Sequence, residues 1–136
     1  MIVSSAAARR GLPYNGAYSA TKAAQLSIAE ALRVELGPSQ IAVSCVMPIG
    51  TETEFFTSAE RISGRRIDLP GAQPKRHSVQ RVVRGMIRAI QKPRAEVFSS
   101  RPTRWGLVLN AAFPTLGDRV MARRMREFQE INRVQV

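Results

Sequence analysis

Tyr18 and Lys22 stand four residues apart near the start of a segment rich in small residues, NGAYSATKAAQLSIAEALRVEL, which runs from Asn15 to Leu36. The pattern predicts a helix from Gly16 to Leu36, and at this spacing two side chains share one helix face, with Cβ atoms roughly 5–6 Å apart. The phenol of a free tyrosine ionises only at about pH 10, but a neighbouring ammonium group favours the phenolate. The pair therefore suits proton transfer, with Tyr18 as the acid or base.

The elements around this pair decide which other groups reach it. Met1–Ser5 reads as the tail of a strand, and Ile41–Val46 is the near-continuous apolar run typical of a strand covered on both faces. Parallel strands joined by a right-handed crossover helix end at the same edge of the sheet, and ligands bind beyond that edge. The residues expected around one crevice there are Ser5, Tyr18, Lys22 and the turn at 48–53.

The rest of the chain continues the alternation of strand and helix. Ser78–Lys92 repeats apolar residues at helical spacing, with basic residues on the opposite side, and predicts an amphipathic helix. Ala95–Ser99 reads as a short strand, and helical pieces are expected over 105–113 and 115–131. The order predicts an α/β fold with about three parallel strands, crossover helices and a helical C-terminal extension, as in the C-terminal half of a Rossmann-like doubly wound sheet.

The formal net charge of +11 raises the question of an anionic partner. The basic residues occur as short pairs spread along the chain, without a recognition motif and without interleaved aromatic residues on which bases would stack. A solvated basic surface is the simpler interpretation. A basic module that binds nucleic acid or an anionic membrane stays a third hypothesis for function.

The single cysteine and single histidine limit the other chemistries. Cys45 lies in the apolar run IAVSCV and is predicted to be a small core residue, and one cysteine allows no internal disulfide. His77 has no acidic or thiol partner at ligand spacing, so no metal site is expected. We recognise neither a secretory signal nor an apolar run of the ~20 residues that span a bilayer, and we expect a cytoplasmic protein.

Met1 to about Thr53 resembles the short-chain dehydrogenase/reductase family, and Ser78–Ser99 resembles it more loosely. The family's tyrosine-x-x-x-lysine motif stands here as Tyr18-Ser-Ala-Thr-Lys22. The family's catalytic serine, thirteen residues before the tyrosine, falls on Ser5. The run LRVELGPSQIAVSCVMPIGTET is similar to the family's helix end, strand and proline turn. The joint spacing is more specific than the short motif alone.

The resemblance implies hydride transfer between a nicotinamide cofactor, NAD or NADP, and a ketone or secondary alcohol. It implies Tyr18 as the acid/base, Lys22 as the group that also holds the nicotinamide ribose, and Ser5 as the partner of the substrate oxygen. By the same resemblance, the cofactor-binding residues would be Tyr18, Lys22, Pro48, Thr51 and Thr53. Ile49 stands where the family has glycine after the proline, so we expect the turn to be shifted or of another type.

Other family features do not occur in the sequence. No glycine cluster follows a predicted strand, and neither the residue that selects NAD or NADP nor the catalytic asparagine is recognised. We therefore expect a fragment, with residues 1–99 as the C-terminal half of a Rossmann-type oxidoreductase domain and 100–136 as the helical extension. Cofactor would bind only in a full-length parent. A non-enzymatic truncated remnant or interaction protein is the alternative.

Two surfaces are expected to need partners. Helix 16–36 is apolar on most sides, and the resemblance implies a homo-oligomer built through it. By resemblance, substrate choice depends on Phe55–Lys75 and on the C-terminal tail. The apolar residues of the tail cover the pocket, pack on a second subunit or touch a membrane surface, and the sequence leaves these three alternatives open. They are Trp105, Leu107, Val108, Leu109 and Phe113.

Overall fold

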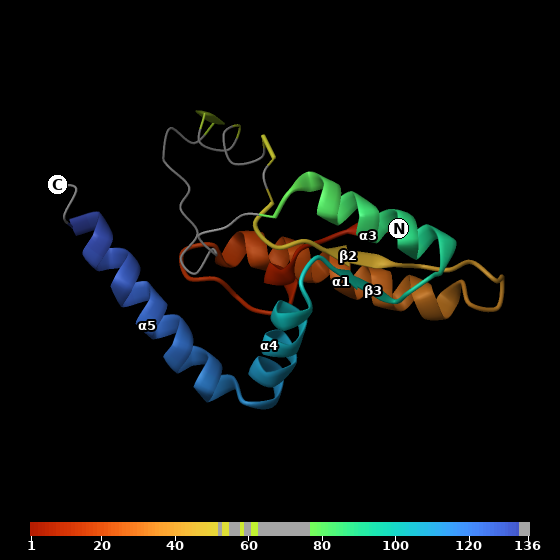
Figure 1. Ribbon diagram of the computed structural model, residues 1–136. Coiled ribbons are helices and arrows are strands. Elements are labelled where there is room, and N and C mark those ends of the chain that lie inside the picture. Colours follow the sequence, from red (N-terminus) through yellow and green to blue (C-terminus); the bar gives the residue numbers. More distant parts are fainter. Residues whose placement is uncertain (52, 55–57, 59–60, 63–76, 134–136) are drawn as a thin grey trace.

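A three-stranded parallel sheet with the order β1-β2-β3 lies at the centre of the molecule (Figure 1). Its strands are β1 (Ile2–Val3), β2 (Cys45–Met47) and β3 (Glu96–Phe98). The computed structural model describes residues 1–51, 53, 54, 58, 61, 62 and 77–133. The parallel pairing of β2 with both neighbours confirms the predicted α/β fold.

Helices follow the strands in the predicted alternation. They are the short 3-10 helix η1 (Ala6–Ala8), α1 (Gly16–Glu35), α3 (Val79–Gln91), α4 (Arg101–Ala112) and α5 (Pro114–Arg133). In Figure 1 the sheet lies between α1 and α3, so both of its faces are covered. The crossover from β1 to β2 through α1 and the crossover from β2 to β3 through α3 move in the same direction across the sheet. Because the two helices lie on opposite faces, the two crossovers have opposite hands. One of them is therefore an exception to the usual right-handed connection.

The core lies between α1 and one face of the sheet. Leu26 and Ala29 of α1 are buried against Cys45 and Met47 of β2, and Cys45, Met47 and Ala29 have no exposed surface. Alternate residues of a strand point to opposite faces, so Val46, between Cys45 and Met47, faces α3. The prediction that Cys45 is a core residue is confirmed.

On the other face, α3 approaches the sheet closely at Gly85. A Cβ atom at this position would lie 3.3 Å from Cγ1 of Val97, which is tighter than most contacts of real Cβ atoms. Ala89 is buried one turn later. The amphipathic helix is confirmed, but several of its apolar side chains, including Ile90, lie exposed beyond the reach of this narrow sheet.

The predicted strand Ile41–Val46 is shifted and shortened to Cys45–Met47. The amide of Ile41 donates to the carbonyl of Leu36, so Ile41 belongs to the turn that closes α1. Gln40 enters that turn with a φ of 59°, in the left-handed region. The apolar run therefore includes residues of the turn, which a hydrophobic pattern does not distinguish from the ladder.

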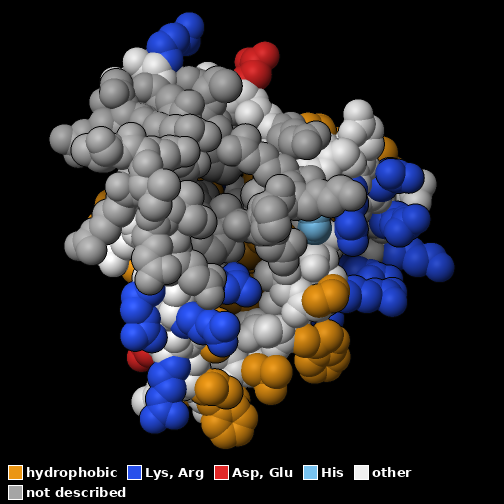
Figure 2. Space-filling view, turned by 60° about the vertical axis from the view of Figure 1, so that its left-hand side comes forward, with side chains coloured by type: hydrophobic (Ala, Val, Ile, Leu, Met, Phe, Trp, Pro, Cys, Tyr) orange, Lys and Arg blue, Asp and Glu red, His pale blue; other side chains and the backbone are white. Residues whose placement is uncertain are grey.

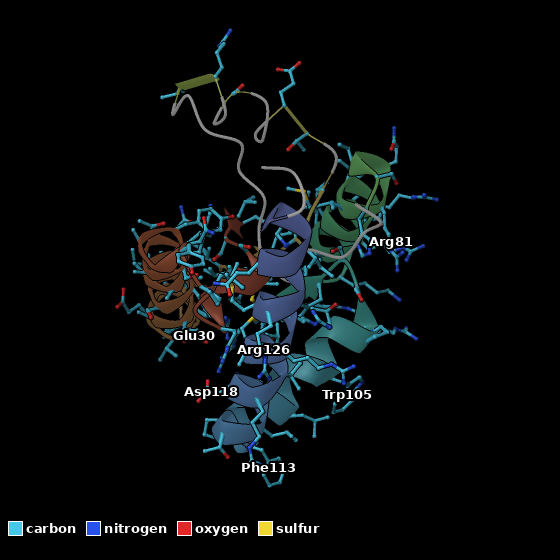
Figure 3. The ribbon with its side chains drawn as sticks, turned by 90° about the vertical axis from the view of Figure 1, so that its left-hand side faces the viewer. Glu30, Arg81, Trp105, Phe113, Asp118 and Arg126 are labelled. Atoms are coloured by element: carbon cyan, nitrogen blue, oxygen red, sulfur yellow. The ribbon has the colours of Figure 1, made fainter. Side chains whose placement is uncertain are left out.

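The last two helices form a corner that projects from the sheet (Figures 1 and 3). Ser100 is the N-cap of α4, and its Oγ accepts a hydrogen bond from the amide of Thr103; α5 starts one residue after Phe113. Arg10 forms an ion pair with Asp118 of α5, and Gln129 of α5 donates to the hydroxyl of Tyr14. Trp105 is 65% exposed, so this side chain does not pack on the sheet.

Within the described part of the chain, none of the helices is long and apolar enough to cross a membrane. The same residues contain no group of three or more histidine, cysteine or acidic side chains that could hold a metal ion.

Candidate active site

The carboxyl ends of the three strands are joined by hydrogen bonds between the segments that follow them. The amide of Ala6, after β1, donates to the carbonyl of Pro48, after β2, at 2.9 Å. The amide of Ile49 donates to Oγ of Ser99, after β3, at 3.3 Å. The loops that follow β1, β2 and β3 thus lie together at one edge of the sheet, as expected for parallel strands.

Ser5 starts the loop beyond β1 and is half-buried. Its backbone is extended, with φ −158° and ψ 158°, and it serves as the N-cap of η1. The side-chain Oγ accepts a hydrogen bond from the amide of Ala7 at 3.2 Å. This acceptor role fixes the position of the oxygen and leaves the hydroxyl proton as a donor group.

The neighbouring serine anchors the helix that carries Tyr18 and Lys22. Ser4 is buried, and its hydroxyl donates to the main-chain carbonyl of Lys22 at 2.7 Å. This hydrogen bond fixes the position of α1 along its axis relative to the carboxyl end of β1. Sequence reasoning singled out Ser5 and missed Ser4, although the Ser-Ser pair at the strand end was the available signal.

Tyr18 and Lys22 share one face of α1, as predicted. Nζ of Lys22 lies 5.8 Å from the centroid of the Tyr18 ring, and both residues are half-buried. Nζ also donates to Oε1 of Gln25 at 3.1 Å. Gln25, one turn further along the same face, therefore helps to hold the ammonium group, and it was not recognised from the sequence.

The start of α1 is held by side-chain contacts as well as by its own backbone. Ser19 is buried, and its Oγ accepts a hydrogen bond from the amide of Leu12 at 3.1 Å. Tyr14, two residues before the helix, has a φ of 58°, which is uncommon for a residue other than glycine. These contacts fix the conformation of the loop that precedes α1, the helix that carries Tyr18.

The turn after β2 is of a type that accepts isoleucine. Among the described non-glycine residues, only Tyr14 and Gln40 have a positive φ, so Ile49 does not need the left-handed conformation. Thr51 closes the turn, because its hydroxyl donates to the carbonyl of Ile49 at 2.6 Å. Whether the turn is shifted or of another type than in the family stays a prediction.

His77 and Ser99 hold this turn in place. The amide of His77 donates to the carbonyl of Gly50 at 2.8 Å, and His77 forms a parallel bridge with Thr51. Nδ1 of His77 lies 3.2 Å from Oγ of Ser99. Oγ of Ser99 therefore accepts the amide of Ile49 and shares a second hydrogen bond with the imidazole of His77.

The electrostatic environment favours the neutral form of the His77 imidazole over its protonated form. Burial lowers the pKa of the imidazole, and the nearby Arg81 guanidinium lowers it further. The sequence showed His77 only as a residue without a metal-ligand partner. Its hydrogen-bond partner, Ser99, is 22 residues away and becomes visible only when β3 lies beside β2.

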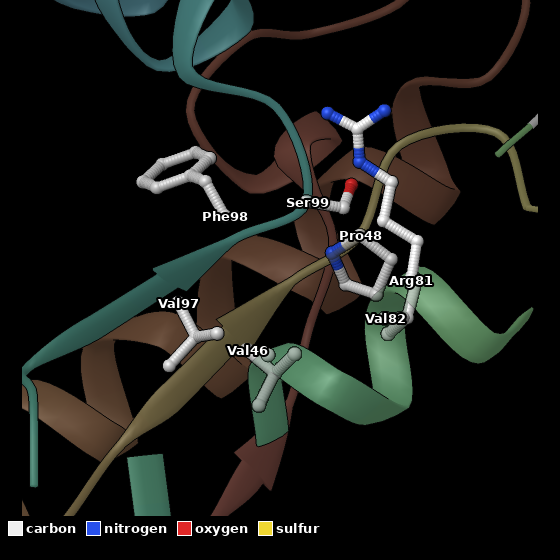
Figure 4. A pocket seen from close by; sticks show the side chains of 8 residues that line it. Val46, Pro48, Arg81, Val82, Val97, Phe98 and Ser99 are labelled. Carbon is white, nitrogen blue, oxygen red and sulfur yellow. The ribbon is translucent and has the colours of Figure 1, made fainter. Parts of the chain in front are cut away.

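The cavity behind this turn is too small for a substrate. It has a volume of about 10 Å³ and lies between α3 and the ends of β2 and β3, with Pro48, Arg81 and Ser99 at its mouth (Figure 4). This volume is that of roughly one water molecule. A wider, open hollow lies along α3 beside Val79 and Val83. Neither space is lined by Ser5, Tyr18 or Lys22.

The predicted site residues are thus placed in three groups. Tyr18 and Lys22 lie together, Ser5 lies beside η1, and Pro48 accepts the hydrogen bond from Ala6, the residue next to Ser5. Thr53 lies exposed in a bend. The common crevice and the roles of these residues stay predictions. The expected substrate segment Phe55–Lys75 lies largely outside the described residues.

Comparison with known proteins supports the resemblance. Residues 1–62 match the family model of short chain dehydrogenases. A short chain dehydrogenase from Burkholderia cenocepacia J2315, solved in complex with NADP, is 26% identical with a TM-score of 0.65, over 89% of this chain and 46% of that chain. A short-chain dehydrogenase from Sphingobium yanoikuyae, in complex with NADPH, is 24% identical with a TM-score of 0.63, over 85% of this chain and 43% of that chain.

These matches confirm the resemblance to short-chain dehydrogenases and the Rossmann-like half-sheet. No curated protein matches the sequence. The chain spans less than half the length of either solved structure. The matched residues 1–62 include the tyrosine–lysine pair, Ser5 and the proline turn.

Proposed function

We propose that residues 1–99 are the catalytic half of an NAD(P)-dependent oxidoreductase of the short-chain dehydrogenase/reductase type, and that residues 100–136 form a helical extension. The reaction would be hydride transfer between a nicotinamide cofactor and a ketone or secondary alcohol. The observation that carries this proposal is the Tyr18–Lys22 pair, with the ammonium 5.8 Å from the ring centroid and Ser4 anchoring Lys22 beside the loop of Ser5.

Three side chains would share the proton chemistry. The Ser5 hydroxyl donates to the substrate oxygen from a position fixed by its capping bond to Ala7. Tyr18 gives its proton to that oxygen in reduction and takes it back in oxidation. Lys22, on the same face of α1, would stabilise the phenolate that remains, because an ammonium group attracts negative charge.

The chemistry of the donor set fits one end of the proposed cofactor. Bound NAD or NADP supplies or accepts the hydride, which side chains cannot do. The Lys22 ammonium is a donor suited to ribose hydroxyls, and the Pro48–Thr51 turn beyond β2 would border the nicotinamide. We assign the pyrophosphate to a glycine-rich loop of a longer parent protein, since no glycine cluster follows a strand in these 136 residues.

We also propose that the parent assembles as a homo-oligomer through helix α1. Its inner face packs on the sheet through Leu26 and Ala29, whereas Ile28 is 53% and Val34 is 78% exposed on the outer side. Ala24 and Ala31, one helical turn before and after Ile28, are also exposed and would let a second helix approach closely. Sedimentation of the parent protein against a Val34→Asp variant tests the contact, and a monomeric unsubstituted protein would contradict it.

The test of the proposed function has two arms. The 136-residue chain alone is expected to show no NADH or NADPH binding at micromolar concentrations in a fluorescence or calorimetric titration. The chain preceded by a cofactor-binding half is expected to reduce members of a panel of ketones with NADH or NADPH and to lose that activity in Tyr18→Phe. Tight, stoichiometric binding by the chain alone would refute its assignment as a fragment. An unchanged rate in Tyr18→Phe would refute the catalytic assignment.

A non-enzymatic interaction protein is the second candidate, because apolar side chains such as Val34 and Trp105 are exposed on two different helices. This candidate predicts that the chain binds a partner whether or not Tyr18 is present. Cofactor titration of the extended protein separates the two candidates.

A further inference from the structure

The corner between α4 and α5 combines exposed apolar side chains at its tip with arginines along both arms. On α4, Trp105, Val108 and Leu109 follow helical spacing and are 65%, 51% and 59% exposed. Phe113, between the helices, is 58% exposed, and Leu116 of α5 is 55% exposed. Exposed apolar side chains this close together are more typical of a contact surface than of ordinary solvated helices.

The charges of the two helices are arranged around this tip. Arg101 and Arg104 precede Trp105 and Val108 by one turn of α4, on the same side of the helix. On α5, Arg119 follows Leu116 by three residues, and further arginines continue towards the C-terminus. The basic residues of the two helices are Arg101, Arg104, Arg119, Arg123, Arg124, Arg126 and Arg133, and the acidic residues are Asp118, Glu127 and Glu130.

The shape of the corner makes the tip accessible. Phe113 lies at the far end of the projection, with Trp105 near it and Arg126 further up α5 (Figure 3). Figure 2 shows hydrophobic side chains gathered at the lower end of the molecule, with Lys and Arg side chains to their left and a second basic cluster higher on the right, beside His77. Asp118, the acidic residue nearest to the corner, is paired with Arg10.

The charge distribution separates the partners that an apolar tip could bind. If a second copy of the chain bound through the same corner, its arginines would face the arginines of the first copy, and the like charges would repel each other. Nucleic acid would attract the arginines, but its phosphates leave Leu109, Phe113 and Leu116 exposed to water. An anionic bilayer satisfies both, because the acyl boundary accepts apolar and aromatic side chains while arginines reach the phosphates of the headgroups.

We propose that the α4–α5 corner docks on anionic membrane surfaces, with Trp105, Leu109 and Phe113 entering the interface and Arg101, Arg104 and Arg119 contacting lipid phosphates. The contact is peripheral, since none of the described helices can span a bilayer. The proposal does not depend on the catalytic assignment, because it uses no residue of the sheet edge.

The chain contains its own probe, since Trp105 is the single tryptophan. Vesicles of phosphatidylcholine with phosphatidylglycerol are expected to bind the 136-residue chain and to shift the Trp105 emission to shorter wavelength. Lipids brominated along the acyl chain should quench that emission. Vesicles of phosphatidylcholine alone should bind much less, because the attraction of arginine to the surface requires anionic lipid.

Matched variants separate insertion from simple attraction by the net charge of +11. Phe113→Ser is expected to weaken partitioning about tenfold or more, from the loss of one buried aromatic side chain. Ile90→Ser is the control, because Ile90 of α3 is 71% exposed but lies outside the corner. Arg119→Gln should weaken binding about fivefold, and Arg88→Gln on α3 much less.

Three results would overturn the proposal, provided that circular dichroism shows the variants to be folded. The first is a Trp105 emission that stays unchanged on anionic vesicles that bind the chain, which indicates attraction without insertion. The second is an equal effect of Phe113→Ser and Ile90→Ser. The third is a concentration-dependent dimer in which Trp105 is shielded, which makes the corner an interface between subunits.

Discussion

Helices α1 and α5 have the same length, twenty residues each, but their positions are determined in different ways. Helix α1 buries Leu26 and Ala29 in the core and is anchored by the hydrogen bond from Ser4. Helix α5 is held by polar contacts at the surface, and Leu116 on its apolar side is more than half exposed. The helix that carries the proposed catalytic pair is thus fixed by packing, and the other by contacts that water can replace.

Two side-chain contacts of α5 end on the loop that leads into α1. Asp118 pairs with Arg10, and Gln129 donates to Tyr14, the residue with the positive φ two positions before the helix. Helix α5 therefore contacts the loop that precedes α1. Substitutions in α1 should change chemistry and stability, whereas substitutions in the tethers should have small effects.

The largest expected effect concerns the two polar residues of α1. In the chain preceded by a cofactor-binding half, Tyr18→Phe should lower turnover by about 10²–10⁴ with nearly normal cofactor affinity, because it removes only the proton donor. Lys22→Ala should lower both quantities, since it removes the partner of the phenolate and the proposed ribose contact. Steady-state kinetics with cofactor titration measure the two effects, and equal losses of affinity in both variants would contradict the division of roles.

The next effect compares the packing of the two helices. Leu26→Ala in α1 should lower the free energy of unfolding of the 136-residue chain by about 2–4 kcal/mol, because it leaves a cavity between the helix and the sheet. Val120→Ala in α5 should change it by less than about 0.5 kcal/mol, since Val120 is 48% exposed. Denaturant unfolding measures both values. Similar values for the two variants would show that α5 is also held by packing.

The hydrogen bonds that hold the proline turn should have an intermediate effect. Ser99→Ala removes the acceptor of the Ile49 amide and the hydrogen-bond partner of His77, and should cost about 1 kcal/mol of unfolding free energy. Ser99→Thr keeps the hydroxyl and is the matched control. Hydrogen exchange at the Ile49 amide provides a local measurement, and it should become faster in Ser99→Ala but not in Ser99→Thr.

The same turn predicts a dependence of stability on pH. Because the pKa of His77 is lowered in the folded chain, the unfolded chain binds the proton more readily. The stabilising contribution is therefore complete above the ordinary pKa of histidine, about 6.5, and is lost as the pH falls through the lowered pKa. His77→Gln should remove this part of the pH dependence. Since His77 is the only histidine, its ring signals report its pKa directly by nuclear magnetic resonance, and a value above the ordinary one would contradict the prediction.

The smallest effect is expected for the tether between Arg10 and Asp118. Asp118 is 68% exposed, so Asp118→Asn should lower stability by less than about 0.5 kcal/mol. Salt should weaken the contact further, and the difference between variant and unsubstituted chain should vanish at high ionic strength. A large loss of stability would mean that α5 is an integral part of the fold.

The order and type of the elements could be predicted because each helix has a periodic pattern and each strand a short apolar run. The bounds of β2 could not be predicted, because Ile41 and Val43 are equally apolar and only the pairing with Ile2 and Glu96 decides where the ladder begins. Likewise the exposure of Trp105 follows from the direction of α4, which the sequence does not contain.

For the candidate site, local spacing was sufficient where both partners lie on one helix, as for Tyr18 and Lys22. It failed for contacts between distant segments. Ser4 reaches the carbonyl of Lys22 across 18 positions, and Ser99 reaches His77 across 22. Hydroxyl groups of this kind have no pattern in a single sequence, because their partners are main-chain atoms or side chains brought close by the sheet.

The corner of α4 and α5 also has an evolutionary consequence. A Cβ atom at Gly117 would lie 1.8 Å from Oδ1 of Asn110, so a methyl group at position 117 displaces the side-chain amide of Asn110. Positions 110 and 117 should therefore vary together among descendants of this gene, with a larger residue at one matched by a smaller residue at the other. Homologous sequences in which both positions carry bulky side chains would show that the corner opens at other angles and that the two positions evolve independently.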